Sequence, residues 1–106
     1  MARKDSIGVG ELTDSAFYIL ASVIEENHGY LIMKTVEELT NGEVTIGPAS
    51  LYTTIKKLLK AGLIELKSEK HQNKKIYKIT NLGKEMLLKE IDRKKQMVKF
   101  AENFLR

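Results

Sequence analysis

Apolar residues recur at helical spacing along four stretches of the chain and alternate with polar residues along two shorter stretches. A spacing of three or four positions gives a helix one buried face, whereas alternation is typical of a strand. The pattern predicts four helices, over residues 14–27, 29–40, 48–61 and 81–106. It predicts two strands, over residues 63–69 and 75–79, joined by a polar tip at residues 70–74. We therefore expect a mainly α-helical protein with one small β-hairpin.

Polar residues and glycines mark the predicted ends of the helices. Thr13 or Asp14 can cap the first helix, because a short oxygen-bearing side chain accepts a hydrogen bond from a free backbone N–H group. Asn41 and Gly42 end the second helix, since both tolerate the left-handed backbone of a helix C-terminus. Pro48 lies in the first turn of the third helix, where its missing N–H group does no harm.

The order of these elements is that of a winged helix-turn-helix. Two short helices separated by a turn are followed by a hairpin, the wing, which reaches past the second of them. Residues 44–46 are of β type, and we expect them to form a third strand of the wing. The expected fold class is mainly α with a small β-wing (α+β). The winged helix-turn-helix domain would occupy residues 1–80, with a flexible arm at 1–11 that contains Gly8 and Gly10.

The last helix, residues 81–106, is expected to be a dimerisation helix. It carries an apolar seam whose members are spaced alternately by four and three positions, as in helices that pair. This seam comprises Leu87, Ile91, Val98, Ala101 and Leu105, with Lys94 set among them. The chain offers no later segment to cover the seam. We therefore expect it to be buried against a second copy of the protein, in a homodimer.

Charge is unevenly distributed along the chain. Residues 1–43 hold three basic and eight acidic residues, a balance of −5, whereas residues 44–106 hold fifteen basic and six acidic residues, a balance of +9. Eight lysines and only two glutamates lie between Lys56 and Lys78. Such an asymmetry indicates a side that faces a polyanion such as nucleic acid. The alternative is a lysine surface that is merely solvated.

The sequence does not favour an enzyme or a metal protein. It contains no cysteine, and its two histidines, His28 and His71, are too far apart to suit a metal site. There is no glycine-rich phosphate loop and no nucleophile with a partner base. We expect no cofactor and no catalytic residue. The N-terminal residues include no apolar run of signal-peptide length, so a cytoplasmic protein without membrane contact is expected.

The outer face of the helix at residues 48–61 is where DNA contacts are expected to concentrate. It presents hydroxyl groups at Ser50 and Thr53 and cations at Lys56 and Lys57. Such side chains suit phosphate groups, and the first residues of a recognition helix reach the edges of bases. Tyr52 lies at the boundary of this face, as either a core-edge aromatic or a phosphate contact. The lysines of the wing, Lys74 and Lys75 among them, are expected to contact the DNA backbone or minor groove.

Two segments carry a resemblance to a known family. They read HGYLIMKTVEELTNGEVTIGPASLYTTIKKLLKAGLIE and KIYKITNLGKEML. In the order and spacing of their motifs, which include HGY, PASLY, GLI and YKITNLG, they closely resemble the PadR family of bacterial transcriptional regulators. The match covers about residues 12 to 104.

The resemblance implies a short-subfamily regulator, with a winged helix-turn-helix and one C-terminal dimerisation helix. It implies that the helix at 48–61 enters the major groove and makes its main contacts through Ser50, Tyr52, Thr53 and Lys56. It also implies that Tyr30 and Lys34 touch the DNA backbone. Members of the family are mostly repressors, and some release DNA when they bind a small aromatic molecule. A dimer of this kind should recognise an inverted-repeat operator in double-stranded DNA.

Any small aromatic or phenolic effector is expected at the dimer interface, because the winged-helix core is too small to hold a ligand-sized pocket. The expected wall comprises Phe17, Tyr18, Ile91, Lys94 and Val98. Drug-responsive relatives carry a Trp on the dimerisation helix, whereas this chain has no Trp and carries Lys94 at about the matching position. A lysine there favours a carboxylate over a planar cationic drug. Alternatively, Lys94 reaches solvent or pairs with Glu90 of the partner subunit.

A second function class remains open at this point. A winged helix can also be a protein-interaction module without specific DNA binding, and the lysines would then only solvate its surface. The two classes differ in how strongly salt weakens DNA binding, since contacts with phosphate groups release counterions.

Overall fold

The computed structural model describes residues 7–70 and 74–105, with only the backbone at positions 69, 70 and 74. The elements, in chain order, are α1 (Asp14–Ser22), β1 (Asn27–His28), α2 (Gly29–Leu39), α3 (Pro48–Lys60), β2 (Ile64–Lys70), β3 (Lys74–Ile79) and α4 (Asn81–Leu105). The mainly helical fold with a small β-wing, predicted above, is confirmed. No described helix combines the length and the apolar character that a membrane crossing requires.

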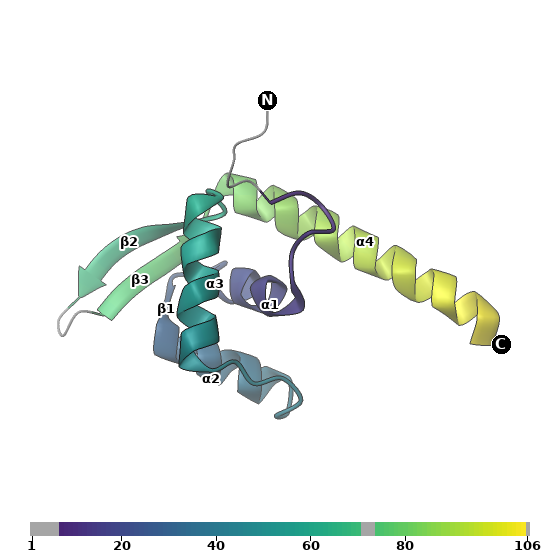
Figure 1. Ribbon diagram of the computed structural model, residues 1–106, viewed down its shortest axis with the longest axis horizontal. Coiled ribbons are helices and arrows are strands. Elements are labelled where there is room, and N and C mark those ends of the chain that lie inside the picture. Colours follow the sequence, from purple (N-terminus) through teal and green to yellow (C-terminus); the bar gives the residue numbers. More distant parts are fainter. Residues whose placement is uncertain (1–6, 71–73, 106) are drawn as a thin grey trace.

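The first three helices pack around one core, with the wing extending from one end of the molecule and α4 from the other (Figure 1). The core side chains come from all four helices and from the sheet, and include Ile19, Leu20, Ile32, Leu51 and Leu58. The first half of α4 contributes Leu87 to this core, whereas its second half projects beyond the rest of the molecule. The core thus fixes α3 and the wing side by side and leaves the end of α4 uncovered.

The wing is a three-stranded antiparallel sheet in the order β1-β3-β2. The predicted hairpin is confirmed, but the expected third strand at residues 44–46 is wrong. That segment has no regular structure, and its β-type composition reflects the burial of Ile46 in the core. The third strand is β1, a two-residue stretch with little β propensity, whose Asn27 and His28 pair with Tyr77 and Ile76.

The first helix ends at Ser22, five residues earlier than predicted. The backbone explains the difference, because the carbonyl of Val23 accepts a hydrogen bond from the N–H group of Ile79 at 2.8 Å. The chain therefore leaves the helix in order to run along β3. As a result Ile24, which lies within the predicted range of this helix, is outside it and 45% exposed, while Ile19 is fully buried.

The start of α4 is held to the turn between α3 and β2. The hydroxyl of Thr80 accepts a hydrogen bond from the N–H group of Gly83 at 3.0 Å and donates one to the carbonyl of Gly62 at 2.6 Å. The N–H group of Thr80 donates to the carbonyl of Leu63 at 3.0 Å. Thr80 therefore caps α4 and also determines where the helix leaves the sheet.

Part of the expected N-terminal arm lies against α4. The side chain of Glu90 is fully buried and accepts a hydrogen bond from the N–H group of Gly10 at 2.6 Å. Its other oxygen accepts one from the Arg93 guanidinium at 2.8 Å. Leu12 follows and enters the core. The described part of the arm is therefore joined to α4 through one buried carboxylate, while residues 1–6 lie outside the described residues.

Candidate nucleic-acid interface

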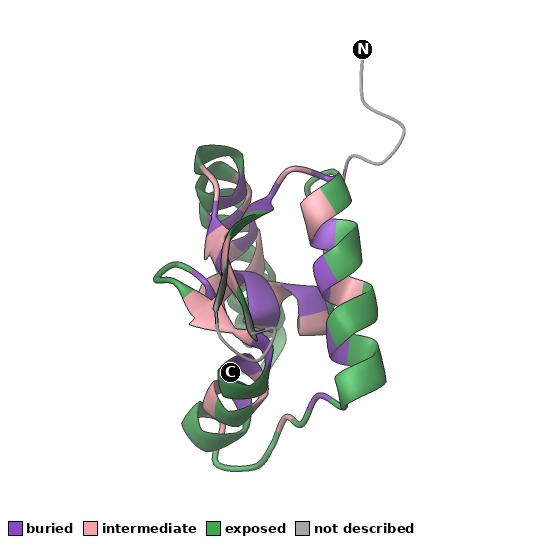
Figure 2. Cartoon of the chain, turned by 90° about the vertical axis from the view of Figure 1, so that its left-hand side faces the viewer, coloured by how far each residue is buried: buried purple, intermediate pink, exposed green. Residues whose placement is uncertain are grey.

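The recognition helix predicted from the sequence is α3, and its two faces divide as expected. Leu51, Ile55 and Leu58 are buried and hold the helix on the core. The opposite side is exposed along the whole helix, as Figure 2 shows from the end of the wing. The exposed candidates on this side are Ser50, Tyr52, Thr53, Lys56 and Lys57. The structure therefore brings all five candidate residues of α3 to one outer surface.

Two further candidates extend this surface onto α2. Tyr30 is 64% exposed, and Lys34 is exposed four residues later, one turn along the same helix. The two helices meet where Tyr52 reaches the beginning of α2, because its hydroxyl lies directly beside Gly29. Tyr52 is 52% exposed, so it is neither a core residue nor a fully solvated one. Its ring packs on the protein as a core-edge aromatic does, and its other face is accessible, so the phosphate contact stays a prediction.

The wing continues the basic surface. Lys67 and Lys75 are exposed on β2 and β3, and Lys78 is half-buried. The pairing of the strands shifts between Leu66 and Ser68, so Lys67 is an extra residue in β2 without a partner in the ladder. The side chain of Lys74, another candidate contact, lies outside the described residues.

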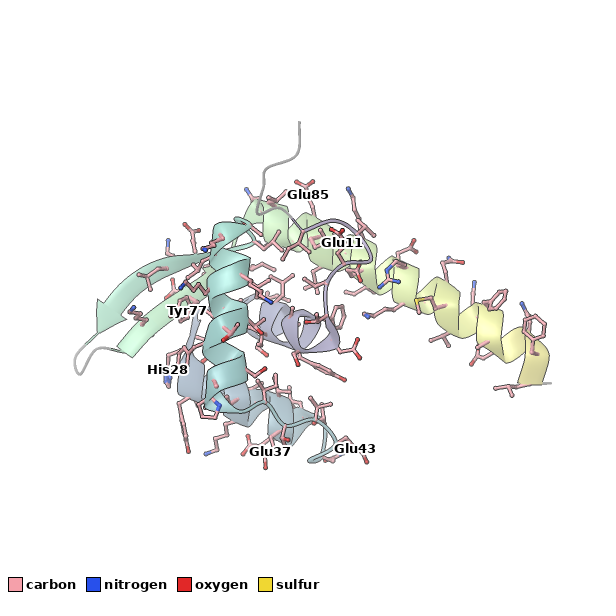
Figure 3. All side chains as sticks on the ribbon, viewed as in Figure 1. Glu11, His28, Glu37, Glu43, Tyr77 and Glu85 are labelled. Carbon is pink, nitrogen blue, oxygen red and sulfur yellow. The ribbon has the colours of Figure 1, made fainter. Side chains whose placement is uncertain are left out.

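Acidic side chains gather elsewhere on the molecule. Glu37 and Glu43 lie at the end of α2 and in the loop after it, away from the wing (Figure 3). Glu25 and Glu38 are also exposed. A group of carboxylates therefore lies around the end of α2, apart from the lysines of α3 and the wing, although Glu65 is exposed on β2 and α4 carries exposed charges of both signs.

Four of the five residues expected around an effector lie together. Phe17 on α1 and Ile91, Lys94 and Val98 on α4 line an open hollow of about 450 Å³. The ammonium group of Lys94 lies 5.0 Å from the centre of the Phe17 ring and 3.8 Å from the carboxylate of Asp14. Asp14 therefore supplies an anion to Lys94 within the same chain.

Tyr18 lies outside this hollow. Its ring meets the edge of Phe17 with the centroids 6.2 Å apart, and it borders a separate depression between α1 and α2. Glu90, considered above as a partner for Lys94, is occupied by Arg93 and Gly10 of its own chain. The hydrogen bond from Arg93 holds the pKa of Glu90 below its ordinary value; burial opposes this shift, and the N–H group of Gly10 adds to it.

The residues of the predicted dimer seam differ in exposure. Leu87 is buried in the core of its own chain, and Ile91 is half-buried. Val98, Ala101 and Leu105 are exposed in the single chain, and Leu105 is 84% exposed. Beside them, Met97, Phe100 and Phe104 are exposed as well. The end of α4 therefore carries a wide apolar face that no described part of the chain covers.

Two contacts at these sites were not found by sequence reasoning. One is the packing of Tyr52 against Gly29, and the other is the buried group formed by Glu90, Arg93 and Gly10. Glu90 and Arg93 are three positions apart on α4, which is a signal for a salt bridge on a helix. Their contact with Gly10 spans 80 positions, and no local pattern indicates it. Within the described residues, no cluster of three or more His, Asp or Glu side chains could hold a metal ion.

Comparisons with known proteins place the chain in a family. The model of the Transcriptional regulator PadR-like family matches residues 19–89, more than half of the chain. A crystal structure of a PadR family transcription regulator from Clostridium difficile R20291 superposes with a TM-score of 0.72 and 25% identity, over 86% of this chain and 98% of that one. A transcriptional regulator from Clostridium thermocellum superposes with a TM-score of 0.78 and 24% identity, over 86% and 89% of the chains, and shows a similar fold.

A curated relative agrees with these structures. The transcriptional regulator YqjI of Escherichia coli (strain K12) is 34% identical over 74 residues, which are 70% of this chain. The same alignment spans only 35% of that protein. Taken with the exposed basic face of α3 and the wing, these matches show that the chain belongs to the PadR-like family of transcriptional regulators, which bind DNA and are not enzymes.

Proposed function

We propose that the protein is a repressor that binds an inverted-repeat operator as a homodimer. The observation that carries this proposal is the set of exposed polar and basic side chains on α3, α2 and the wing. It combines hydroxyl groups near the start of α3 with Lys56 and Lys57 further along, and Lys75 on β3. Hydroxyl groups and lysines are the side chains that contact phosphate, and the first turns of such a helix reach base edges. With DNA as its ligand, the protein would act in the cytoplasm.

The homodimer is supported by the uncovered end of α4. Its apolar side chains recur every three or four residues, so they share one side of the helix. An exposed face of this kind on a small protein marks an interaction site. A second copy related by a two-fold axis would place two α3 helices in successive major grooves, about 34 Å apart. This geometry is why the operator is expected to be an inverted repeat.

Salt-dependent DNA binding tests the proposal. We expect the logarithm of the affinity for duplex DNA to fall linearly with the logarithm of salt concentration, because lysine–phosphate contacts release counterions. Lys56→Ala, Lys57→Ala and Lys75→Ala should each weaken binding to every sequence and reduce the slope by about one unit per contact. The matched control is Lys89→Ala, which removes an exposed lysine from α4. A DNA affinity that does not change with salt concentration would instead favour a protein-interaction module.

The hollow between α1 and α4 supports a second element of the proposal, an effector site. It combines the Phe17 ring, aliphatic side chains and the Lys94 ammonium group, which together suit an aromatic carboxylate such as a phenolic acid. Aromatic acids should displace Asp14 from Lys94, quench tyrosine emission and release DNA. Cationic dyes that bind equally well before and after Lys94→Ala, with no response to any acid, would rule out this assignment.

A further inference from the structure

Gly29 is the first residue of α2, and its backbone does not require a glycine. The glycines with a left-handed backbone among the described residues are Gly10, Gly42 and Gly62. Gly29 therefore lies in a region that any residue can adopt, at a helix position where alanine is intrinsically favoured over glycine. Its presence has to be explained by what surrounds it, since Gly29 is buried.

The space beside Gly29 is occupied by the end of the Tyr52 side chain. A Cβ atom added at Gly29 would lie 2.5 Å from the hydroxyl oxygen of Tyr52, 3.0 Å from Cζ and 3.1 Å from Cε1. Real side chains do not approach one another so closely. The ring of Tyr52 thus crosses from α3 to the start of α2 and rests on the one residue type that leaves room for it.

The position of the Tyr52 hydroxyl matters because the tyrosine belongs to the candidate interface. Half of its surface is exposed, between Ser50 and Thr53 on α3 and Tyr30 on α2. Among the described residues its hydroxyl has no hydrogen-bond partner, so its proton is available to a ligand. A tyrosine whose ring is held on one side loses less conformational freedom when its hydroxyl is bound.

We propose that Gly29 is a positioning residue for DNA recognition. It allows the Tyr52 ring to lie across the start of α2, and this packing directs the hydroxyl toward a DNA phosphate. The inference rests on the proposed function, because it requires the surface of α3 to bind DNA. An alanine at Gly29 would displace the far end of Tyr52, which is flexible, and would leave the backbone of α2 in place.

The test compares Gly29→Ala, Tyr52→Phe, Tyr52→Ala and the double variant Gly29→Ala/Tyr52→Ala. The probe is a set of duplexes of about 30 base pairs, long enough for two half-sites, selected by the wild-type protein from a random-sequence pool. Gly29→Ala should weaken binding several-fold, to a similar extent as Tyr52→Phe, and should leave the salt slope unchanged because no ionic contact is lost. In the Tyr52→Ala background, Gly29→Ala should have no further effect. Lys89→Ala is the control, since Lys89 is exposed on α4 and lies outside the candidate interface.

The thermal unfolding temperature separates positioning from simple packing. Gly29→Ala should unfold at the wild-type temperature or above it, while its DNA affinity falls. If it unfolds at a lower temperature and Tyr52→Ala restores stability, the contact is structural and the inference is wrong. Equal affinity of Gly29→Ala and wild type would also overturn it. Failure of the wild-type protein to bind any duplex would instead overturn the proposed function, and the inference with it.

Discussion

At the scale of single residues, Gly83 determines how closely α4 can approach the rest of the protein. It is buried in the first turn of α4, against the backbone carbonyl of Leu63 and the side chain of Ile79. The N–H group of Gly83 also donates a hydrogen bond to the hydroxyl of Thr80. The short motif from Thr80 to Gly83 therefore joins a helix cap to a close backbone contact, and the close contact does not tolerate a larger residue at Gly83.

Gly83→Ala should therefore destabilise the protein. The new methyl group would overlap the Leu63 carbonyl, which is backbone and cannot rotate away. We expect a loss of about 1–3 kcal/mol in the free energy of unfolding, the usual cost of overpacking a core. Urea unfolding measures it, and Lys84→Ala serves as the control because Lys84 is exposed in the same turn of α4. Similar unfolding midpoints for the two variants would contradict this account.

At the scale of elements, Glu90 connects the N-terminal arm to α4, and this connection should depend on pH. The Arg93 guanidinium holds the pKa of Glu90 below its ordinary value of about 4.5. Ionised Glu90 stabilises the folded state, so its contribution is complete above the ordinary value and is lost as the pH falls through the lowered pKa. Glu90→Gln should lower the unfolding temperature at pH 7 and lower it less at pH 3, below the ordinary pKa of the carboxyl.

Glu85→Gln is the control for this experiment, because Glu85 is an exposed carboxylate near the start of the same helix (Figure 3). Its unfolding temperature should follow that of the wild type at both pH values. A difference between wild type and Glu90→Gln that does not change with pH would show that the carboxylate acts through shape and not through its charge.

The elements also show which parts of the fold could be predicted from sequence. The spacing of apolar residues along α3 correctly predicted which face is buried and which is exposed, because this spacing depends only on the burial of one side of the helix. The end of α1 and the third strand could not be predicted, since both depend on the hydrogen bonds of β3. Val23 and Asn27 leave the helical pattern only because β3, some fifty positions later, lies beside them. The packing of Tyr52 on Gly29 is likewise a tertiary contact without a local signal.

At the scale of the whole molecule, the end of α4 should determine the oligomeric state. Val98 and Phe104 are 56% and 74% exposed, so an aspartate at either position leaves the core of the single chain intact. Val98→Asp and Phe104→Asp should therefore yield folded monomers in sedimentation experiments at micromolar concentration, whereas the wild type sediments as a dimer. Leu87→Asp should fail to fold, because Leu87 belongs to the core. A wild-type protein that sediments only as a monomer would contradict the proposed homodimer.

The separation of charge described above gives the molecule an electric dipole. A group of glutamates, Glu37 and Glu43 among them, lies around the end of α2, while Lys56, Lys57 and Lys75 lie on α3 and the wing. In the field of a DNA duplex, such a molecule is turned before contact, so that α3 and the wing arrive first. Collisions are then productive more often than for an unoriented protein, and the association rate rises at low ionic strength. The regulator would find its operator quickly for reasons that lie partly in glutamates that never touch DNA.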